Sequence, residues 1–126
     1  MNPSIFALAS APGRAGVAVV RVSGPLAGPV VEVCAVAKRD LKAGETLDDY
    51  GEFMTYGEAV NSEEMRVGRY LPEGLVEGCV LKRDVAKDGL LRYDDVEIPE
   101  GRLADRLRQE QYERFPAPAT AVPATA

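Results

Sequence analysis

Short apolar runs separated by glycine, proline and charged residues occupy most of the chain, and this pattern predicts strands and turns. Residues 5–9 and 17–22 are rich in apolar and β-branched side chains, and they flank a Pro/Gly-containing connection at 11–16. This arrangement is typical of a β-hairpin. Arg21 interrupts the second run, so one face is expected to be apolar and the other accessible to solvent or a ligand. Because two strands alone are barely stable in water, we expect the hairpin to dock on something.

A near repeat, spaced by about 44 residues, links residues 35–49 with residues 79–95. Each copy passes from a short apolar stretch into Lys-Arg-Asp, a glycine-containing turn, a hydrophobic residue and an Asp-Asp pair, and the copies align with small insertions. Aspartate accepts hydrogen bonds from turn amides, and glycine adopts positive φ without steric cost. Two copies are too few for a solenoid, so the repeat favours a pseudo-symmetric β domain built from two halves.

The rest of the chain completes the expected organisation. Leu103 and Leu107, with Phe115 two turns further on, predict a short amphipathic helix over 102–115. The uncharged tail that follows is expected to be disordered. The prediction is an N-terminal hairpin segment (1–24), a linker (25–29), a mostly β domain with short helices (30–115) and the tail (116–126). Core candidates between the repeats are Phe53, Met54, Tyr56, Val60, Met65, Val67 and Tyr70.

Composition narrows the classes of function. The 126 residues are 46% hydrophobic and 28% charged, with a net charge of −5, which fits one soluble domain whose surface repels nucleic acid. No apolar run approaches the ~20 residues of a membrane span, and no signal peptide is evident, so a cytoplasmic location is expected. The sequence contains no histidine and its two cysteines form no CxxC motif. Four-ligand zinc sites and Ser-His or Cys-His nucleophiles are therefore not expected, and Cys34 and Cys79 are interpreted as buried thiols.

Basic and acidic pairs within the repeats are the first candidates for chemistry. Lys38-Arg39 and Lys82-Arg83 could hold a sugar acid or a phosphate, but the aspartate that follows each pair favours local neutralisation. The pairs 48–49 and 94–95 could bind a hard cation, yet adjacent carboxylates in a turn usually point apart, which favours turn or cap duty. Tyr50 and Tyr56 are candidates for contacting the flat face of a carboxylate or sugar-like ligand.

The opening segment offers two further candidates. The connection 11–16 invites a phosphate-loop interpretation, but the residues after it are strand-like rather than helical, which favours a structural turn. Arg21 is a charge within an apolar strand, and an edge position or a pairing with Glu32 explains it without any ligand.

Two family resemblances add expectations. The phrases AKRDLKAGETLDDYGEFMTYGEA, LPEGLVEGCVLKRDV and EGRLADRLR, within residues 30–115, resemble a SAF domain of the β-clip type, specifically the module that ends homoserine-dehydrogenase-like NAD(P)-dependent oxidoreductases. This resemblance implies a small pseudo-symmetric barrel. Related modules occur in proteins of several activities, and the chain has no Gly-x-Gly-x-x-Gly dinucleotide motif, so no hydride chemistry is placed here.

The phrase SIFALASAPGRAGVAVVRVSG, within residues 1–25, is similar to the start of MnmE-type tRNA-modifying GTPases. In that family the opening domain binds a formyl-tetrahydrofolate, and the resemblance places Arg21 on the arginine that contacts it. The nucleotide-binding Gly-x-x-x-x-Gly-Lys-Ser/Thr loop is absent from this sequence, so GTP hydrolysis by these residues is not expected.

Three functional hypotheses follow. The first is a non-catalytic SAF-type accessory module, without cofactor or metal, that serves in assembly or binds a carboxylate or sugar-like molecule through Lys38, Arg39, Tyr50, Tyr56, Lys82 and Arg83. The alternative is a fragment or subunit of a folate-binding, MnmE-type tRNA-modification protein, or an enzyme subunit that completes a tRNA-modification or dehydrogenase site only with a larger enzyme partner. In the third, hairpin edges pair between chains to give a homo-oligomer.

Overall fold

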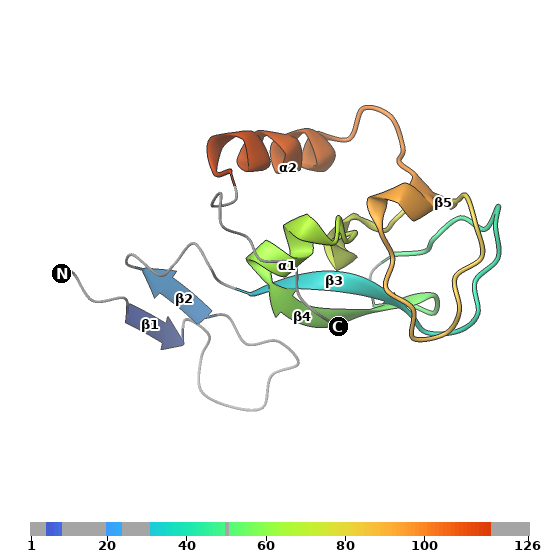
Figure 1. The fold of residues 1–126 in the computed structure, drawn as a ribbon, viewed down its shortest axis with the longest axis horizontal. Helices are drawn as coiled ribbons and strands as arrows, with labels where there is room; N and C mark the ends of the chain where they lie inside the picture. Colours follow the sequence, from blue (N-terminus) through green and yellow to red (C-terminus); the bar gives the residue numbers. More distant parts are fainter. Residues whose placement is uncertain (1–4, 9–19, 24–30, 50, 117–126) are drawn as a thin grey trace. The chain divides into compact units, whose positions relative to one another are not determined.

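The structure is a computed structural model that describes residues 5–8, 20–23, 31–49 and 51–116. The chain divides into two compact units, Met1–Val30 and Val31–Ala126. In the first unit, β1 (Ile5–Leu8) and β2 (Val20–Ser23) pair antiparallel (Figure 1). The predicted hairpin is therefore confirmed for these two strands. The connection 11–16, the linker 25–29 and the tail from 117 onward lie outside the described residues.

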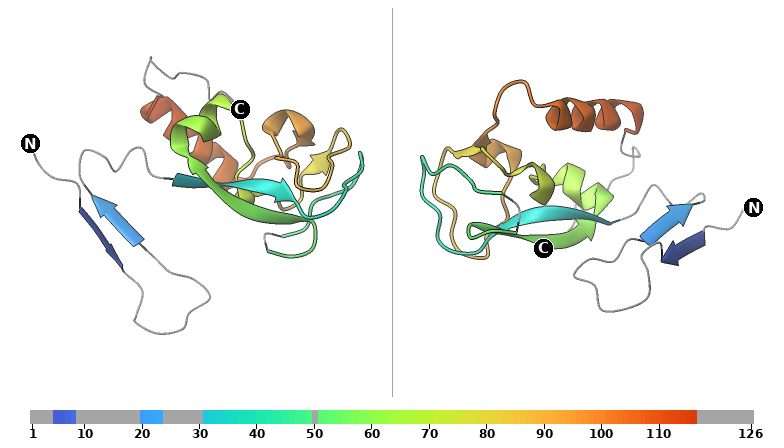
Figure 2. Two further views of the ribbon diagram at one scale, coloured as in Figure 1. Left: turned by 60° about the horizontal axis from the view of Figure 1, so that its bottom comes forward. Right: turned by 180° about the vertical axis from the view of Figure 1, so that it is seen from behind.

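The second unit is a mixture of short strands and helices rather than a mostly β domain. Strands β3 (Val31–Ala37) and β4 (Thr55–Asn61) form the longest antiparallel pair. Helix α1 (Ser62–Val67) follows β4 directly and packs on this pair, and the longer α2 (Leu103–Arg114) runs along one side of the unit (Figures 1 and 2). The remaining elements are the 3-10 turn η1 (Glu73–Leu75), β5 (Val80–Leu81), the 3-10 turn η2 (Tyr93–Asp95) and β6 (Val96–Glu97).

The two copies of the repeat pair with each other through a local two-fold relation. At its centre, Leu41 and Val85 exchange both backbone hydrogen bonds, at 2.8 and 3.0 Å. The hydrogen bonds on either side of this centre come in equivalent pairs, because each residue of one bond corresponds to a residue 44 positions away in the other. The Ala37 amide donates to the Gly89 carbonyl and the Leu81 amide to the Glu45 carbonyl, both at 2.9 Å. The Leu91 amide donates to the Ala35 carbonyl at 2.9 Å and the Leu47 amide to the Cys79 carbonyl at 2.8 Å. The repeat read from the sequence is therefore a pair of halves that complete each other.

The aspartates of the two Lys-Arg-Asp motifs reinforce this pairing. Asp40 Oδ1 accepts a hydrogen bond from the Lys87 amide, and Asp84 Oδ1 accepts one from the Ala43 amide, both at 2.9 Å. Each aspartate serves turn amides, as expected for this residue, but the amide belongs to the opposite copy. In the structure the two copies correspond at a constant spacing of 44 residues, so positions 48–49 match 92–93 rather than 94–95. The two Asp-Asp pairs are therefore not equivalent, and the sequence alignment that matched them through small insertions is wrong at that point.

The second unit is not the closed small barrel that the sequence predicts. Its described strands form two separate two-stranded sheets, β3–β4 and β5–β6, and single bridges such as Leu41–Val85 and Thr46–Val80 link the repeat copies. β5 and β6 have two residues each, because a bend directly follows β5 and the 3-10 turn η2 directly precedes β6. Strands this short leave no continuous ladder around the unit.

The core is aliphatic, as a chain with 6% aromatic residues and no tryptophan favours. Cys34 and Cys79 are both buried and unpaired, and burial raises the pKa of both thiols, which confirms their interpretation as buried thiols. Phe53 is 81% exposed and Val67 51% exposed, so their prediction as core residues is wrong. The main cluster contains Ala35, Ala37, Leu41, Leu47, Met54, Leu71, Val76, Cys79, Leu81, Val85, Leu91 and Val96, and a second cluster contains Cys34, Val60 and Met65.

Helix α2 has the predicted position, but its polar side faces the rest of the unit. Leu103 and Leu107 are 57% and 52% exposed, and Phe115 after the helix is also exposed. Asp105, Arg108 and Tyr112 lie instead on the covered side, where they line a pocket. The predicted helix is therefore present, but the prediction that its apolar residues form a buried face is wrong.

Candidate functional site

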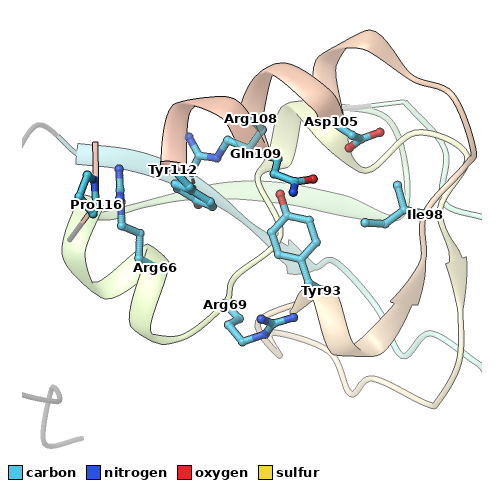
Figure 3. Close-up of a pocket in the computed structure, with 9 residues that line it drawn as sticks. All are labelled: Arg66, Arg69, Tyr93, Ile98, Asp105, Arg108, Gln109, Tyr112 and Pro116. Atoms are coloured by element: carbon cyan, nitrogen blue, oxygen red, sulfur yellow. Dashed lines mark hydrogen bonds between the residues drawn. The ribbon is translucent and has the colours of Figure 1, made fainter. Parts of the chain in front are cut away.

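A pocket of about 610 Å³ lies beneath the covered side of α2 (Figure 3). Its walls come from the end of α1 and the loop after it, from η2, from the segment after β6 and from α2. The volume falls within the range of about 300–1,000 Å³ that is usual for small-molecule sites. The lining residues are Arg66, Arg69, Tyr93, Ile98, Asp105, Arg108, Gln109, Tyr112 and Pro116.

Arg108 links the α2 side of the pocket to the rest of the unit. Its guanidinium pairs with Glu32 of β3, and it donates hydrogen bonds to the Tyr112 hydroxyl at 2.6 Å and to Gln111 Oε1 at 2.9 Å. The side chains of Arg108 and Glu32 are only 15% and 20% exposed. Glu32 is therefore engaged by Arg108, whereas the sequence suggested a pairing with Arg21. An ion pair this enclosed holds the polar side of α2 toward the core.

The start of α2 is fixed by a second arginine. The Arg102 guanidinium donates to the carbonyls of Leu75 and Glu77, at 3.0 and 2.6 Å, and to both carboxylate oxygens of Asp105, at 3.0 and 2.5 Å. These bonds satisfy backbone carbonyls around η1 and place Asp105 at the pocket wall. Asp105 is thus neutralised by Arg102 rather than left as a free carboxylate in the pocket.

The other two arginines of the pocket are held more loosely. Arg66 donates to the Phe115 carbonyl and lies over the Tyr112 ring, 4.6 Å from its centroid. Arg69 pairs with Asp94 at 3.2 Å, where both side chains are about 60% exposed. Exposed pairs of this kind contribute little to stability, so Arg69 is available to another anion.

Tyr93 supplies a flat and partly apolar wall. Its ring projects from η2 toward α2, with the hydroxyl on the side of Gln109 (Figure 3). Burial raises the pKa of Tyr93 to about 12, so the hydroxyl stays protonated at neutral pH and is able to donate a hydrogen bond. Ile98 contributes an apolar side chain to the same pocket.

The basic residues predicted from the repeat lie elsewhere, and none of them lines this pocket. Arg39 pairs with Glu45 at 2.8 Å, and Arg83 pairs with the buried Asp95. Lys38 donates to the Glu52 carbonyl, and Lys82 lies exposed after β5. Both arginines are neutralised, but by Glu45 and Asp95 rather than by the aspartate that follows each of them.

The predicted aromatic and folate-type contacts are only partly described. The Tyr56 hydroxyl donates to Asp88 Oδ1 at 3.2 Å, away from the pocket beneath α2. Tyr50 lies outside the described residues. Arg21 is in β2, opposite Ala7, and the structure describes its backbone only. Ligand contacts by these residues stay predictions.

A buried carboxylate lies near Lys38, in Glu73 of η1. Its side chain is enclosed, its Oε1 accepts a hydrogen bond from the Thr55 hydroxyl at 3.0 Å, and its Oε2 has no partner in the described part of the chain. Burial raises the pKa of Glu73, against the opposing effects of Thr55, the Gly51 amide and Lys38. The charged form is therefore the one that folding disfavours.

Replacement of Glu73 by glutamine is expected to stabilise the protein at pH 7 by about 1 kcal/mol. The folded state binds the Glu73 proton more tightly than the unfolded state, so this group costs stability as the pH rises from its ordinary pKa of 4.5 through the raised value. Urea denaturation of both proteins at pH 4 and pH 7 measures the difference, which should be larger at pH 7. Glu58→Gln, on the exposed part of β4, is the control and should show no such pH-dependent gain. An equal effect of Glu73→Gln at both pH values would contradict the prediction.

One sequence signal for the pocket was overlooked. Arg102, Asp105, Arg108 and Tyr112 recur at spacings of three and four residues, so they lie on one face of a helix. The buried face of this helix was predicted from Leu103 and Leu107 instead, because the covered face of a helix is usually apolar. Arg66, Arg69 and Tyr93 belong to other elements, and no local pattern joins them to α2.

Comparison with known proteins finds relatives along part of the chain. This chain is similar to the tRNA modification GTPase MnmE of Pseudomonas aeruginosa (strain UCBPP-PA14). The two are 44% identical over 69 residues, which cover 55% of this chain and 14% of the relative. The protein of the same name from Cupriavidus necator is 46% identical over 59 residues, or 44% of this chain and 12% of the relative. The chain thus spans about a seventh of the length of these curated relatives, and no family model matches it.

These matches change the balance between the two resemblances. A match of 69 residues is longer than residues 1–25, so the similarity to MnmE proteins extends beyond the opening segment. The resemblance of residues 30–115 to an oxidoreductase SAF module finds no support in the comparisons. Among the helices that the structure describes, none is long and apolar enough to cross a membrane.

Proposed function

We propose that this chain is a non-catalytic, ligand-binding part of an MnmE-type tRNA-modification protein. The identity of 44% over 69 residues with the tRNA modification GTPase MnmE of P. aeruginosa carries the proposal. The proposal assigns no GTP hydrolysis to these residues, because the sequence contains no Gly-x-x-x-x-Gly-Lys-Ser/Thr loop. Its contribution is therefore binding, with the chemistry supplied by other parts of the complete protein or by a larger partner.

The hairpin is the part that binds the ligand in this proposal. Its second strand contains the Arg-Val-Ser part of the Arg-Val-Ser-Gly phrase, and the resemblance to MnmE-type GTPases implies that its arginine, Arg21, contacts a formyl-tetrahydrofolate. The antiparallel register of β1 and β2 holds Arg21 within a paired strand, opposite Ala7, so its backbone position is defined by the ladder. A planar guanidinium is suited to the carboxylates of such a ligand.

Isothermal titration of the whole chain with 5-formyltetrahydrofolate tests this function. We expect saturable binding, and Arg21→Ala should weaken it at least tenfold, because a charge-assisted hydrogen bond contributes about 1.5–3 kcal/mol. Arg14→Ala is the matched control: it removes the same side chain from the connection 11–16, outside the Arg-Val-Ser-Gly phrase, and should leave the affinity unchanged. Absence of saturable heat, or equal losses in both variants, would reject the assignment.

A second candidate function is favoured by the two-fold pairing of the repeat copies. In it, Lys38, Arg39, Tyr50, Tyr56, Lys82 and Arg83 bind a carboxylate or sugar-like molecule. Two equivalent Lys-Arg-Asp motifs presented by one unit support it, whereas the ion pairs of Arg39 and Arg83 oppose it, because a ligand must displace Glu45 or Asp95. A thermal-shift screen with gluconate and galacturonate should raise the melting temperature of the wild-type protein but not of Lys38→Ala/Lys82→Ala. No shift with either sugar acid would reject this candidate.

A further inference from the structure

The pocket beneath α2 contains two kinds of arginine. Arg108 is largely buried, forms an ion pair with Glu32 and donates hydrogen bonds to Tyr112 and Gln111, so its role is structural. For Arg66, no carboxylate lies within ion-pair distance among the residues that the structure describes, and its hydrogen bond to the Phe115 carbonyl uses one of its five N–H donors. The pocket therefore retains positive charge on an otherwise acidic chain.

Arg69 occupies a backbone position that favours glycine. The Tyr70 amide donates to the Met65 carbonyl and the Arg69 amide to the Arg66 carbonyl, both at 3.1 Å, which is the Schellman pattern at the end of α1. In this pattern the residue after the helix cap adopts a left-handed conformation, and Arg69 has φ +51°. An arginine there is strained, and its side chain lies in the pocket rather than in the core.

The side of the pocket formed by Tyr93 and Ile98 suits a flat ring. Tyr93 presents an aromatic ring and a protonated hydroxyl, Ile98 presents an apolar side chain, and Gln109 presents an amide (Figure 3). The Tyr112 ring is already covered by the guanidinium groups of Arg66 and Arg108, at 4.6 and 4.4 Å from its centroid. A ring in the pocket would therefore pack against Tyr93 and Ile98, because the Tyr112 ring is occupied.

We propose that this pocket binds a small molecule that bears an oxyanion on a flat ring, with the carboxylate or phosphate group paired to Arg69, the ring against Tyr93 and Ile98, and Arg66 adding positive charge at the far end of the pocket (Figure 3). The site lies in the second unit and does not depend on the tetrahydrofolate proposal for the hairpin. Arg69 exchanges its exposed contact with Asp94 for the ligand, which is why an otherwise unfavourable arginine is useful at this position.

A titration followed by two-dimensional ¹H–¹⁵N NMR of the whole chain tests the proposal. The ligands are adenosine 5′-monophosphate, indole-3-carboxylate, adenosine and inorganic phosphate, each added to 10 mM. We expect saturable shifts of the amides of Arg69, Tyr93 and Gln109 with at least one of the two ring-bearing anions, at an affinity at least tenfold above that of adenosine or phosphate alone. The stronger of the two ring-bearing anions identifies the oxyanion as phosphate or carboxylate.

Arg69→Gly separates binding from folding. Glycine relieves the left-handed strain and removes only an exposed ion pair, so the melting temperature should stay the same or rise, while the affinity falls at least tenfold. Arg66→Gln should also weaken binding. Arg106→Gln, an exposed arginine of α2 that does not line this pocket, is the matched control and should bind like the wild type.

Several results would overturn the proposal. These are the absence of saturable shifts with both ring-bearing anions, shifts confined to residues away from the pocket, binding of adenosine or phosphate as tight as that of the stronger ring-bearing anion, and an unchanged affinity in Arg69→Gly.

Discussion

Replacement of Leu41 by alanine is expected to lower the free energy of unfolding by about 3 kcal/mol, within the range of 2–5 kcal/mol for buried leucines. Leu41 is fully buried and lies where the two repeat copies meet, exchanging both backbone hydrogen bonds with Val85. A cavity there removes packing from both halves at once, because neither half has a core of its own. For a unit of this size the melting temperature should fall by roughly 10–20 °C.

Leu103→Ala is the matched control for this change. The same three heavy atoms are removed, but Leu103 is 57% exposed at the start of α2, so the loss should stay below about 0.5 kcal/mol. Urea denaturation monitored by circular dichroism measures both variants. Similar losses in Leu41→Ala and Leu103→Ala would show that the two-fold centre is not the core of the protein.

The pairing of the repeat copies was predictable because its signals are local. Lys-Arg-Asp and a turn residue with positive φ occur in both copies, with Gly44 in the first and Asp88 at the equivalent place in the second. The sequence therefore indicates two similar halves. It did not reveal that the halves make single bridges rather than a closed barrel, because that depends on how soon each strand ends at a turn.

The orientation of α2 was not predictable from its own sequence. Periodicity places the helix correctly, but Leu103 and Leu107 make the outer face look like the buried one. The deciding contact is between Arg108 and Glu32, which are 76 positions apart in the chain. An ion pair over such a separation has no signature in a local pattern, and the pocket that it creates is hidden for the same reason.

The adjacent carboxylates 94 and 95 have different roles, although the sequence pattern led to the same expectation for both. Adjacent side chains were expected to point apart, and they do: Asp94 is exposed beside Arg69, whereas Asp95 is buried beside Arg83. A capping role was also expected, and Asp95 Oδ2 accepts a hydrogen bond from the Arg92 amide, at 2.8 Å, at the start of η2. What the sequence could not show is that only one of the two carries this duty.

Replacement of Asp95 by alanine should therefore destabilise the protein by about 2 kcal/mol, because it removes a helix-cap acceptor and a charge-assisted bond to Arg83 together. The 3-10 turn η2 positions Tyr93, so the loss should also disturb the pocket wall and shift the Tyr93 amide resonance. Asp94→Ala removes the same group one residue earlier, from an exposed pair with Arg69, and should cost less than about 0.5 kcal/mol. Urea denaturation of the two variants side by side gives both values. A loss in Asp94→Ala as large as that in Asp95→Ala would mean that η2 is held by surface charge rather than by its buried cap.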